Sequence, residues 1–274
     1  MSDTPFQPPS PEKQALASFS KDIGYEIPIE TVPLPSKGVV YDAEHPLFNE
    51  SGIDVKAMTA KEEDLLTSSA LIKNGTVISR LIQSCLLNKT VDPDSLLTGD
   101  RNALLIAIRI TGYGAEYSAK IQCPECDEQF EYEFTLQGLK ITNLGADPLE
   151  ANRNLFGFDL PSKRTVHFRL LTGWDEAELS VQKTRRKKLG DKSDKDVTSR
   201  LLRAVVSIGG ETDPSKVAKM VLNMPARDAR ALRKYIAKIS PDVDMKQFAT
   251  CSFCNEESEV NIPLGVSFFW PDVE

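Results

Sequence analysis

Two pairs of cysteines constrain this chain more than any other feature of its sequence. Cys123 and Cys126 form one C-x-x-C motif, and Cys251 and Cys254 form a second one near the C-terminus. Four thiolates are the ligand set that a closed tetrahedral Zn²⁺ site needs, and each pair can wrap the ion in a tight turn. The two motifs therefore predict a structural zinc site with these four cysteines as ligands.

The segments that flank the cysteines alternate in polarity as β-strands do. Residues 117–122 lead into the first pair, residues 130–134 leave it, and residues 258–262 follow the second pair. Two hairpins with a cysteine pair at each tip are the layout of a zinc ribbon. If both pairs bind one ion, residues 127–250 are an insertion whose two ends meet.

Other interpretations of the cysteines stay open. The pairs could be reduced or degenerate knuckles without metal. A redox motif would place its C-x-x-C at a helix N-terminus, whereas the residues after Cys126 are strand-like. Disulfides need an oxidising compartment, and the N-terminus lacks the pattern of a signal peptide, so a cytosolic protein is expected. Cys85 lies alone in an apolar helical run and is predicted to be a small buried hydrophobe.

Composition limits the class of protein. A chain of 274 residues with 41% hydrophobic content can form one large or two modest domains. No apolar run approaches the ~20 residues that span a bilayer, so we expect a soluble protein without a membrane partner. The net charge of −7 disfavours non-specific binding to nucleic acid. The basic cluster at 183–188 is predicted to be a solvated helix end, with an acidic protein or a nucleic acid as the alternative.

The order of the predicted elements indicates an α+β protein. It would have a helical N-terminal region, zinc-ribbon-like β-hairpins and an inserted α-helical module. The expected divisions are an extended or disordered arm at 1–30, a helical region at 31–114, a zinc-ribbon-like domain at 115–138 plus 245–274, and a β-hairpin and helical insertion at 149–240.

Local signals predict where several helices begin and end. Thr59 and Glu62 have the spacing of a capping box, which starts a helix that runs to Asn74. Asp100 can cap a helix that begins at Arg101. Further helices are predicted at 76–87, 174–188, 196–206 and 227–239.

Catalysis finds little support. His45 precedes a proline in a loop, and His167 lies in a predicted strand, where a lone histidine is more often structural. No nucleophile elbow, P-loop, glycine-rich dinucleotide loop or H-E-x-x-H motif is present. We therefore expect a protein that is not an enzyme and has no small-molecule substrate.

Several motifs follow one another in a recognisable order. They are Pro33–Tyr41, Met58–Leu66, Gly99–Arg109, Gly112–Gly114 and the first cysteine pair. In these the chain resembles the baseplate hub assembly proteins of T-even-type contractile-tailed bacteriophages, mainly over residues 31–135. The resemblance implies a role in virion morphogenesis, as a chaperone or scaffold in the host cytoplasm that helps the baseplate hub form, or as a part of the virion tail baseplate.

The resemblance also implies that the partners are other baseplate or tail hub proteins. We expect an extended segment, together with the N-terminal arm before it, to make the contact by adding as a strand or by lying in a groove. Its residues are Leu34, Pro35, Ser36, Lys37, Gly38 and Tyr41. The alternatives are a permanent structural subunit of the baseplate and a zinc-ribbon protein that binds nucleic acid through its basic cluster. The acidic residues at the ribbon tips argue against nucleic acid.

Overall fold

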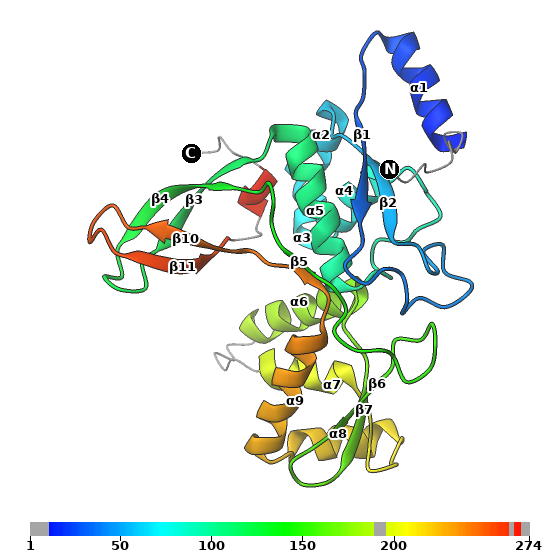
Figure 1. The fold of residues 1–274 in the computed structure, drawn as a ribbon, viewed down its shortest axis with the longest axis vertical. Helices are drawn as coiled ribbons and strands as arrows, with labels where there is room; N and C mark the ends of the chain where they lie inside the picture. The colour runs from blue at the N-terminus through cyan, green and yellow to red at the C-terminus, as the bar shows by residue number, and fades with distance from the viewer. Residues whose placement is uncertain (1–10, 189–195, 263–265, 270–274) are drawn as a thin grey trace, which may run out of the picture.

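The molecule is elongated and has three parts (Figure 1). The computed structural model describes residues 11–188, 196–262 and 266–269. Helices and an N-terminal strand pair form the upper part, two long hairpins project to one side, and a second group of helices with a small sheet forms the lower part. This mixture of helices and small antiparallel sheets confirms the predicted α+β class.

The upper part is built around one buried helix, α5. Its elements are α1 (Pro11–Ile23), β1 (Ile29–Pro33), β2 (Gly52–Lys56), α2 (Ala60–Thr67), α3 (Ser69–Asn74), α4 (Val77–Cys85) and α5 (Thr98–Tyr113). Leu104, Ile106 and Ile108 of α5 are all buried, so this helix packs on more than one side. The antiparallel pair β1 and β2 packs against it.

The projecting part consists of two antiparallel hairpins. They are β3 (Glu116–Gln122) with β4 (Gln129–Thr135), and β10 (Lys246–Thr250) with β11 (Glu257–Asn261). Exposed and buried residues alternate strictly along β3, as the sequence period predicts. The first hairpin buries Tyr117 and Phe130, and the second buries Ala249. Each hairpin therefore has one apolar inner face and one polar outer face.

The lower part combines a three-stranded sheet with four helices. Its elements are β6 (Phe156–Asp159), β7 (Thr165–Phe168), α6 (Gly173–Lys188), α7 (Asp196–Ala204), β8 (Val205–Ile208), α8 (Pro214–Leu222) and α9 (Ala226–Ile239). The strand order is β6-β7-β8. The short strands β5 (Ile141–Thr142) and β9 (Asp242–Val243) pair antiparallel, so the chain enters and leaves this part side by side. The last described element is the 3-10 helix η1 (Val266–Phe269).

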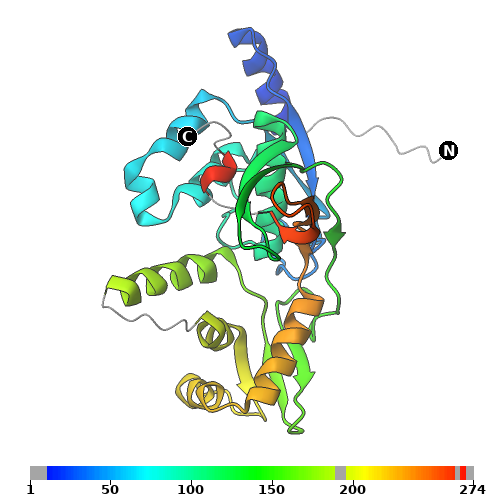
Figure 2. The same cartoon turned by 90° about the vertical axis from the view of Figure 1, so that its left-hand side faces the viewer.

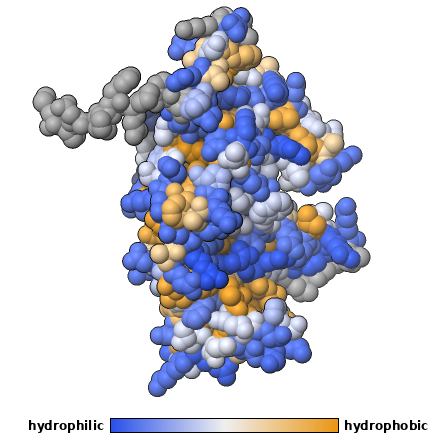
Figure 3. Space-filling view, turned by 90° about the vertical axis from the view of Figure 1, so that its right-hand side faces the viewer, coloured by the Kyte–Doolittle hydropathy of each residue, from blue (hydrophilic) through white to orange (hydrophobic). Residues whose placement is uncertain are grey.

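The surface agrees with this division. The side of the molecule in Figure 3 is mostly hydrophilic and is hollowed between the upper and lower parts. Figure 2 shows α6 directed away from the rest of the lower part. Among the helices that the structure describes, none has the length and apolar character to cross a membrane.

The N-terminal arm differs from the expectation. Residues Pro11–Ile23 form a helix, where an extended or disordered arm was predicted. Proline is well tolerated in the first turn of a helix, and Glu12 favours the same turn through the helix dipole. These local signals outweigh the polar composition that suggested disorder. Residues 1–10 of the predicted arm lie outside the described residues.

Two helix boundaries also differ. The helix predicted to run from 59 to 74 is divided at Ser68, whose backbone is extended with φ −67° and ψ 104°. The helix predicted over 196–206 ends at Ala204, because Val205 pairs with Phe168 as part of a sheet. In both cases tertiary packing overrides a weak local preference.

The predicted capping box at the start of α2 is confirmed. The carboxylate of Glu62 accepts a hydrogen bond from the backbone N–H of Thr59 at 3.0 Å. Asp100, in contrast, does not cap a helix at Arg101. Helix α5 already begins at Thr98, which places Asp100 inside its first turn.

The first turn of α5 touches the chain that returns from the lower part. A Cβ atom at Gly99 would lie 1.9 Å from the carbonyl oxygen of Pro241, so only glycine allows the two backbones to come this close. Next to this contact, the side chain of Asn102 donates a hydrogen bond to Asp242 at 2.9 Å. This turn therefore holds the segment at 241–242, through which the chain leaves the lower part.

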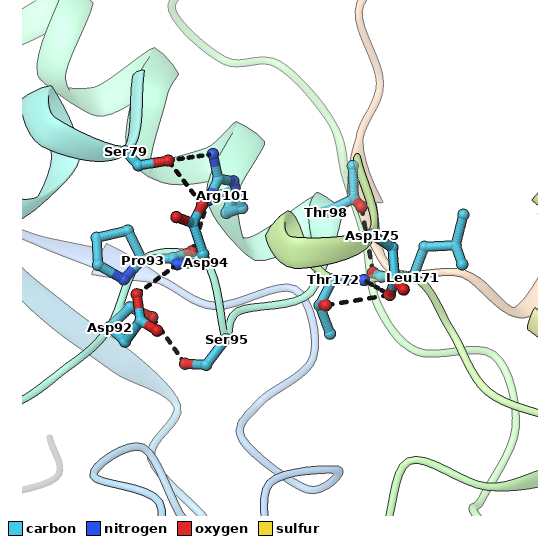
Figure 4. A network of polar contacts seen from close by, with 10 residues as sticks. All are labelled: Ser79, Asp92, Pro93, Asp94, Ser95, Thr98, Arg101, Leu171, Thr172 and Asp175. Carbon is cyan, nitrogen blue, oxygen red and sulfur yellow. Dashed lines mark hydrogen bonds and ion pairs between the residues drawn. The ribbon is translucent and has the colours of Figure 1, made fainter. Parts of the chain in front are cut away.

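The same turn also fixes the start of α6 (Figure 4). The guanidinium of Arg101 donates to the carbonyl oxygen of Pro93 at 2.8 Å and pairs with the carboxylate of Asp94. The carbonyl of Asp94 accepts the backbone N–H of Trp174 at 2.8 Å. The backbone N–H and hydroxyl of Thr98 both donate to the carbonyl of Leu171 at 3.1 Å. Upper and lower parts are thus joined by backbone contacts.

We predict that Gly99→Ala lowers the free energy of unfolding by about 1–3 kcal/mol, because the new methyl group must push two backbone segments apart. The matched control is Gly112→Ala in the same helix. A Cβ at Gly112 meets the movable side chain of Met58, with the nearest atom at 3.1 Å, so we expect little change. Urea unfolding of both variants measures the difference. Equal stability of the two variants would contradict this account of the junction.

Candidate metal centre

The four predicted cysteines lie together at the tips of the two hairpins. Their sulfur atoms are all within 4.8 Å of one another. The Sγ atoms of Cys123 and Cys254 are 3.7 Å apart, and so are those of Cys126 and Cys251. None of the four forms a disulfide. The structure therefore brings together cysteines that are 125 and 131 residues apart in the sequence.

This spacing suits a tetrahedral metal ion. Four thiolates at Zn–S bond lengths of about 2.3 Å have sulfur atoms about 3.8 Å apart. Cys123 and Cys251 are buried, while Cys126 and Cys254 are partly exposed. The four cysteines can hold one metal ion, and they supply all of the ligands of a closed site.

The two cysteine turns have the same backbone hydrogen bonds. In the first, the N–H of Cys123 donates to the carbonyl of Glu128 at 2.9 Å, and the N–H of Asp127 donates to the carbonyl of Cys123 at 3.0 Å. In the second, Cys251 donates to Glu256 at 3.0 Å, and Asn255 donates to Cys251 at 2.9 Å. The two knuckles are therefore copies of one local structure.

A signal for these knuckles was present in the sequence but was missed. Asp127 and Asn255 each follow the second cysteine of a pair, and both have φ of 60°. Asp and Asn tolerate this left-handed conformation better than other residues with a side chain. The fuller motif is thus C-x-x-C followed by Asp or Asn.

Backbone dipoles favour a thiolate in the second knuckle. Burial raises the pKa of Cys251, but hydrogen bonds from the backbone N–H groups of Cys254 and Phe253, together with those from the Cys254 and Cys123 thiols, outweigh it and lower the pKa to about 7. The N–H of Phe253 lies 3.4 Å from the Cys251 sulfur. A thiolate is the form that binds metal.

The base of the hairpins is held by a buried arginine that sequence reasoning did not single out. Arg109 is 1% exposed, and its guanidinium donates to the carbonyl oxygens of Phe268, Gly114 and Glu116 at 2.9, 2.9 and 3.0 Å. The ring of Tyr117 packs edge-on against Phe268. Because burial of an arginine is costly without such partners, these contacts hold η1 and β3 at the end of α5.

The predicted partner-binding segment lies inside the fold. Leu34, Pro35, Ser36, Gly38 and Tyr41 are buried. Of the six residues predicted to contact a partner, Lys37 alone is exposed. Residues 35–40 form turns instead of the predicted extended segment, and Asp100 of α5 binds Ser36 and Tyr41. Five of the six residues are therefore not accessible to another subunit.

Asp100 is the reason that this segment is buried. Its carboxylate accepts the N–H of Ser36 at 2.9 Å, the Ser36 hydroxyl at 2.6 Å and the Tyr41 hydroxyl at 2.6 Å. Burial raises the pKa of Asp100, and the hydrogen bonds from Ser36 and Tyr41 oppose that rise. The Tyr41 oxygen also accepts the N–H of Leu97 at 3.0 Å, which links the segment to the start of α5.

A serine and a histidine lie close together, but their hydrogen bonds are not those of a nucleophile and its base. Nδ1 of His45 accepts the N–H of Leu47 at 3.1 Å, so in the neutral ring Nε2 carries the proton. Nε2 lies 2.9 Å from the Ser95 hydroxyl, which itself donates to the carbonyl of Asp92 at 2.7 Å. Burial lowers the pKa of His45, which favours this neutral form. His45 therefore donates to Ser95 and does not activate it.

Comparison with known proteins agrees with these features. The model of the family described as T4 bacteriophage base plate protein matches residues 30–270, a span that includes both cysteine pairs and the first turn of α5. The chain belongs to this family. Membership indicates a structural role in the phage baseplate, where the chain contacts other baseplate proteins. No curated protein and no solved structure matches the chain.

We predict that Tyr41→Phe lowers the free energy of unfolding by about 1–3 kcal/mol, because it removes one of the three hydrogen bonds that the buried Asp100 carboxylate accepts and leaves the Leu97 N–H without a partner. Tyr25→Phe is the control, since the Tyr25 side chain is 76% exposed. Chemical unfolding of both variants measures the effect. A Tyr41→Phe protein as stable as the control would show that the hydroxyl is dispensable.

We predict that the folded protein binds roughly one metal ion per chain and that Cys126→Ser sharply reduces this occupancy and the stability. Cys85→Ala is the control, because Cys85 is buried in α4 and its loss leaves all four ligands in place. Native mass spectrometry measures occupancy, and thermal unfolding measures stability. A fully folded protein that contains no metal when prepared without chelator would overturn the prediction.

Proposed function

We propose that this protein is a non-enzymatic assembly protein of the baseplate hub of a contractile-tailed bacteriophage. The observation that carries the proposal is the family match over residues 30–270. The motif order that resembles hub assembly proteins supports the choice of the hub. The hydrogen bonds of His45 and Ser95 give no support to a hydrolytic activity.

We propose zinc as the metal. Thiolate ligands favour soft or borderline metals, and a closed set of four cysteines is typical of structural zinc. The pairing of two knuckles with matching backbone hydrogen bonds supports this choice. The ion would join the tips of two hairpins that are far apart in the sequence, and so make the projecting part rigid.

We propose that the chain binds other baseplate or tail hub proteins in the host cytoplasm. It would act there either as an assembly chaperone that leaves or as a permanent subunit of the baseplate. We propose that the N-terminal arm contacts these partners, because the segment at 34–41 is largely buried. The exposed side chains of Phe19 and Tyr25, in and after α1, support this location, since they are 52% and 76% exposed. Both precede residue 30, where the family match begins.

We also propose that the chain is organised as an N-terminal arm, a helical region, the zinc ribbon and an insertion at 149–240. The pairing of β5 with β9 supports the insertion, because it brings the two connecting segments together. An insertion with adjacent ends leaves the ribbon free to form from residues 115–138 and 245–274.

We predict that peptides of this protein are enriched in hub assembly intermediates from infected cells. Quantitative peptide mass spectrometry of these intermediates and of purified particles measures this. Whole-number stoichiometry in finished particles would identify a permanent subunit, and enrichment in intermediates alone would identify an assembly factor that leaves. Absence from both would refute the baseplate role of this chain.

A further inference from the structure

The negative charge of this protein is concentrated in one part of the molecule. Residues 115–138 and 245–262, which contain the two cysteine hairpins, have nine acidic and two basic side chains, a formal charge of −7. The whole chain also has a formal charge of −7, so the remaining residues sum to zero. The projecting hairpins are therefore an acidic lobe on an otherwise neutral molecule.

The second hairpin adds exposed aromatic side chains to this charge. Phe248 of β10 is 63% exposed and lies opposite Glu259 of β11, so both face outward. At the tip of the same hairpin, Phe253 is 61% exposed. Glu256 and Glu257 lie between Phe253 and Glu259 in the chain, and both are exposed. Glu259 pairs with Lys246 at 3.0 Å and adds no free charge. We call Phe248, Phe253, Glu256 and Glu257 the acidic face.

Helix α6 presents the complementary pattern. Trp174, Val181, Arg185 and Lys188 are spaced by seven, four and three residues, which places them along one side of the helix. Trp174 and Val181 are each 59% exposed, and Arg185 and Lys188 are also exposed. We call these four residues the basic stripe. It combines apolar area in its first half with positive charge in its second half.

The two surfaces of one molecule do not meet. The hairpins extend to the left in Figure 1 and toward the viewer in Figure 2, whereas α6 extends to the left in Figure 2. A contact between them therefore needs two molecules. Phe248 and Phe253 can pack against the apolar side chains of Trp174 and Val181. Glu256 and Glu257 are opposite in charge to Arg185 and Lys188.

We propose that the acidic face of one copy of this chain docks on the basic stripe of a second copy. One such contact leaves a free basic stripe on the first copy and a free acidic face on the second. The contact is therefore heterologous and can continue into a ring or an open chain. Because both surfaces are small and charged, the association is weak and depends strongly on salt. This inference does not rest on the proposed hub role.

Sedimentation equilibrium of the full-length, metal-bound protein tests the proposal. We expect self-association at about 0.01 M ionic strength, where charges act over about 30 Å, and dissociation at about 1 M, where they act over about 3 Å. Arg185→Glu with Lys188→Glu should weaken association by at least about tenfold. Glu256→Lys with Glu257→Lys should do the same, and a mixture of these two double variants should associate again.

The matched control is Lys61→Glu with Lys73→Glu, which changes the net charge by the same amount as the basic-stripe variant but on α2 and α3, away from both surfaces. It should associate like the wild type. Circular dichroism and metal content confirm that each variant is folded.

Four outcomes would overturn the proposal. The first is a wild-type protein that is monomeric at low salt. The second is equal association of the control and the basic-stripe variant. The third is failure of the mixed variants to associate. Binding of duplex DNA by the wild type, with loss of binding in the basic-stripe variant, would assign this stripe to nucleic acid and would also overturn self-association.

Discussion

The first turn of α5 holds the molecule together because its residues contact several segments that are far apart in the chain. Gly99 allows the backbone of Pro241 to approach, and Asn102 binds Asp242. Asp100 binds the segment around Ser36 and Tyr41, and Arg101 binds the loop before the helix. A buried helix start has N–H groups and side chains that must find partners. Here those partners come from both the upper and the lower part, so the arrangement of the two parts depends on this turn.

The hairpins are anchored in a second way, at both of their ends. At the tips, the cysteine pairs can share one metal ion. At the base, the buried guanidinium of Arg109 donates to three carbonyl oxygens, those of Glu116 in β3, Gly114 at the end of α5 and Phe268 in η1. A two-stranded hairpin is only marginally stable alone. Attachment at both ends explains how two such hairpins can project from the body as a defined acidic lobe.

The clustering of the four cysteines could be predicted from sequence, whereas the placement of the segment at 34–41 could not. Cysteine spacing and period-2 alternation are local signals, and they identified all four cysteines and the strands beside them. The proline-containing run at 34–41 was predicted to be an extended docking segment, but residues 35–40 form turns that follow β1. Asp100, which binds this run, lies 64 residues after Ser36. Arg109 was missed for the same reason, since its partner Phe268 lies 159 residues away.

The sequence by itself determined the α+β class, the two C-x-x-C turns and the capping box of α2, because each depends on residues that are neighbours in the chain. The tertiary structure alone decided that Ser36 and Tyr41 are buried, that Gly99 meets Pro241 and that the acidic lobe and α6 point in different directions. These features depend on close approach between segments separated by tens to hundreds of residues. Burial and polar contacts of that kind leave no periodic pattern in the sequence.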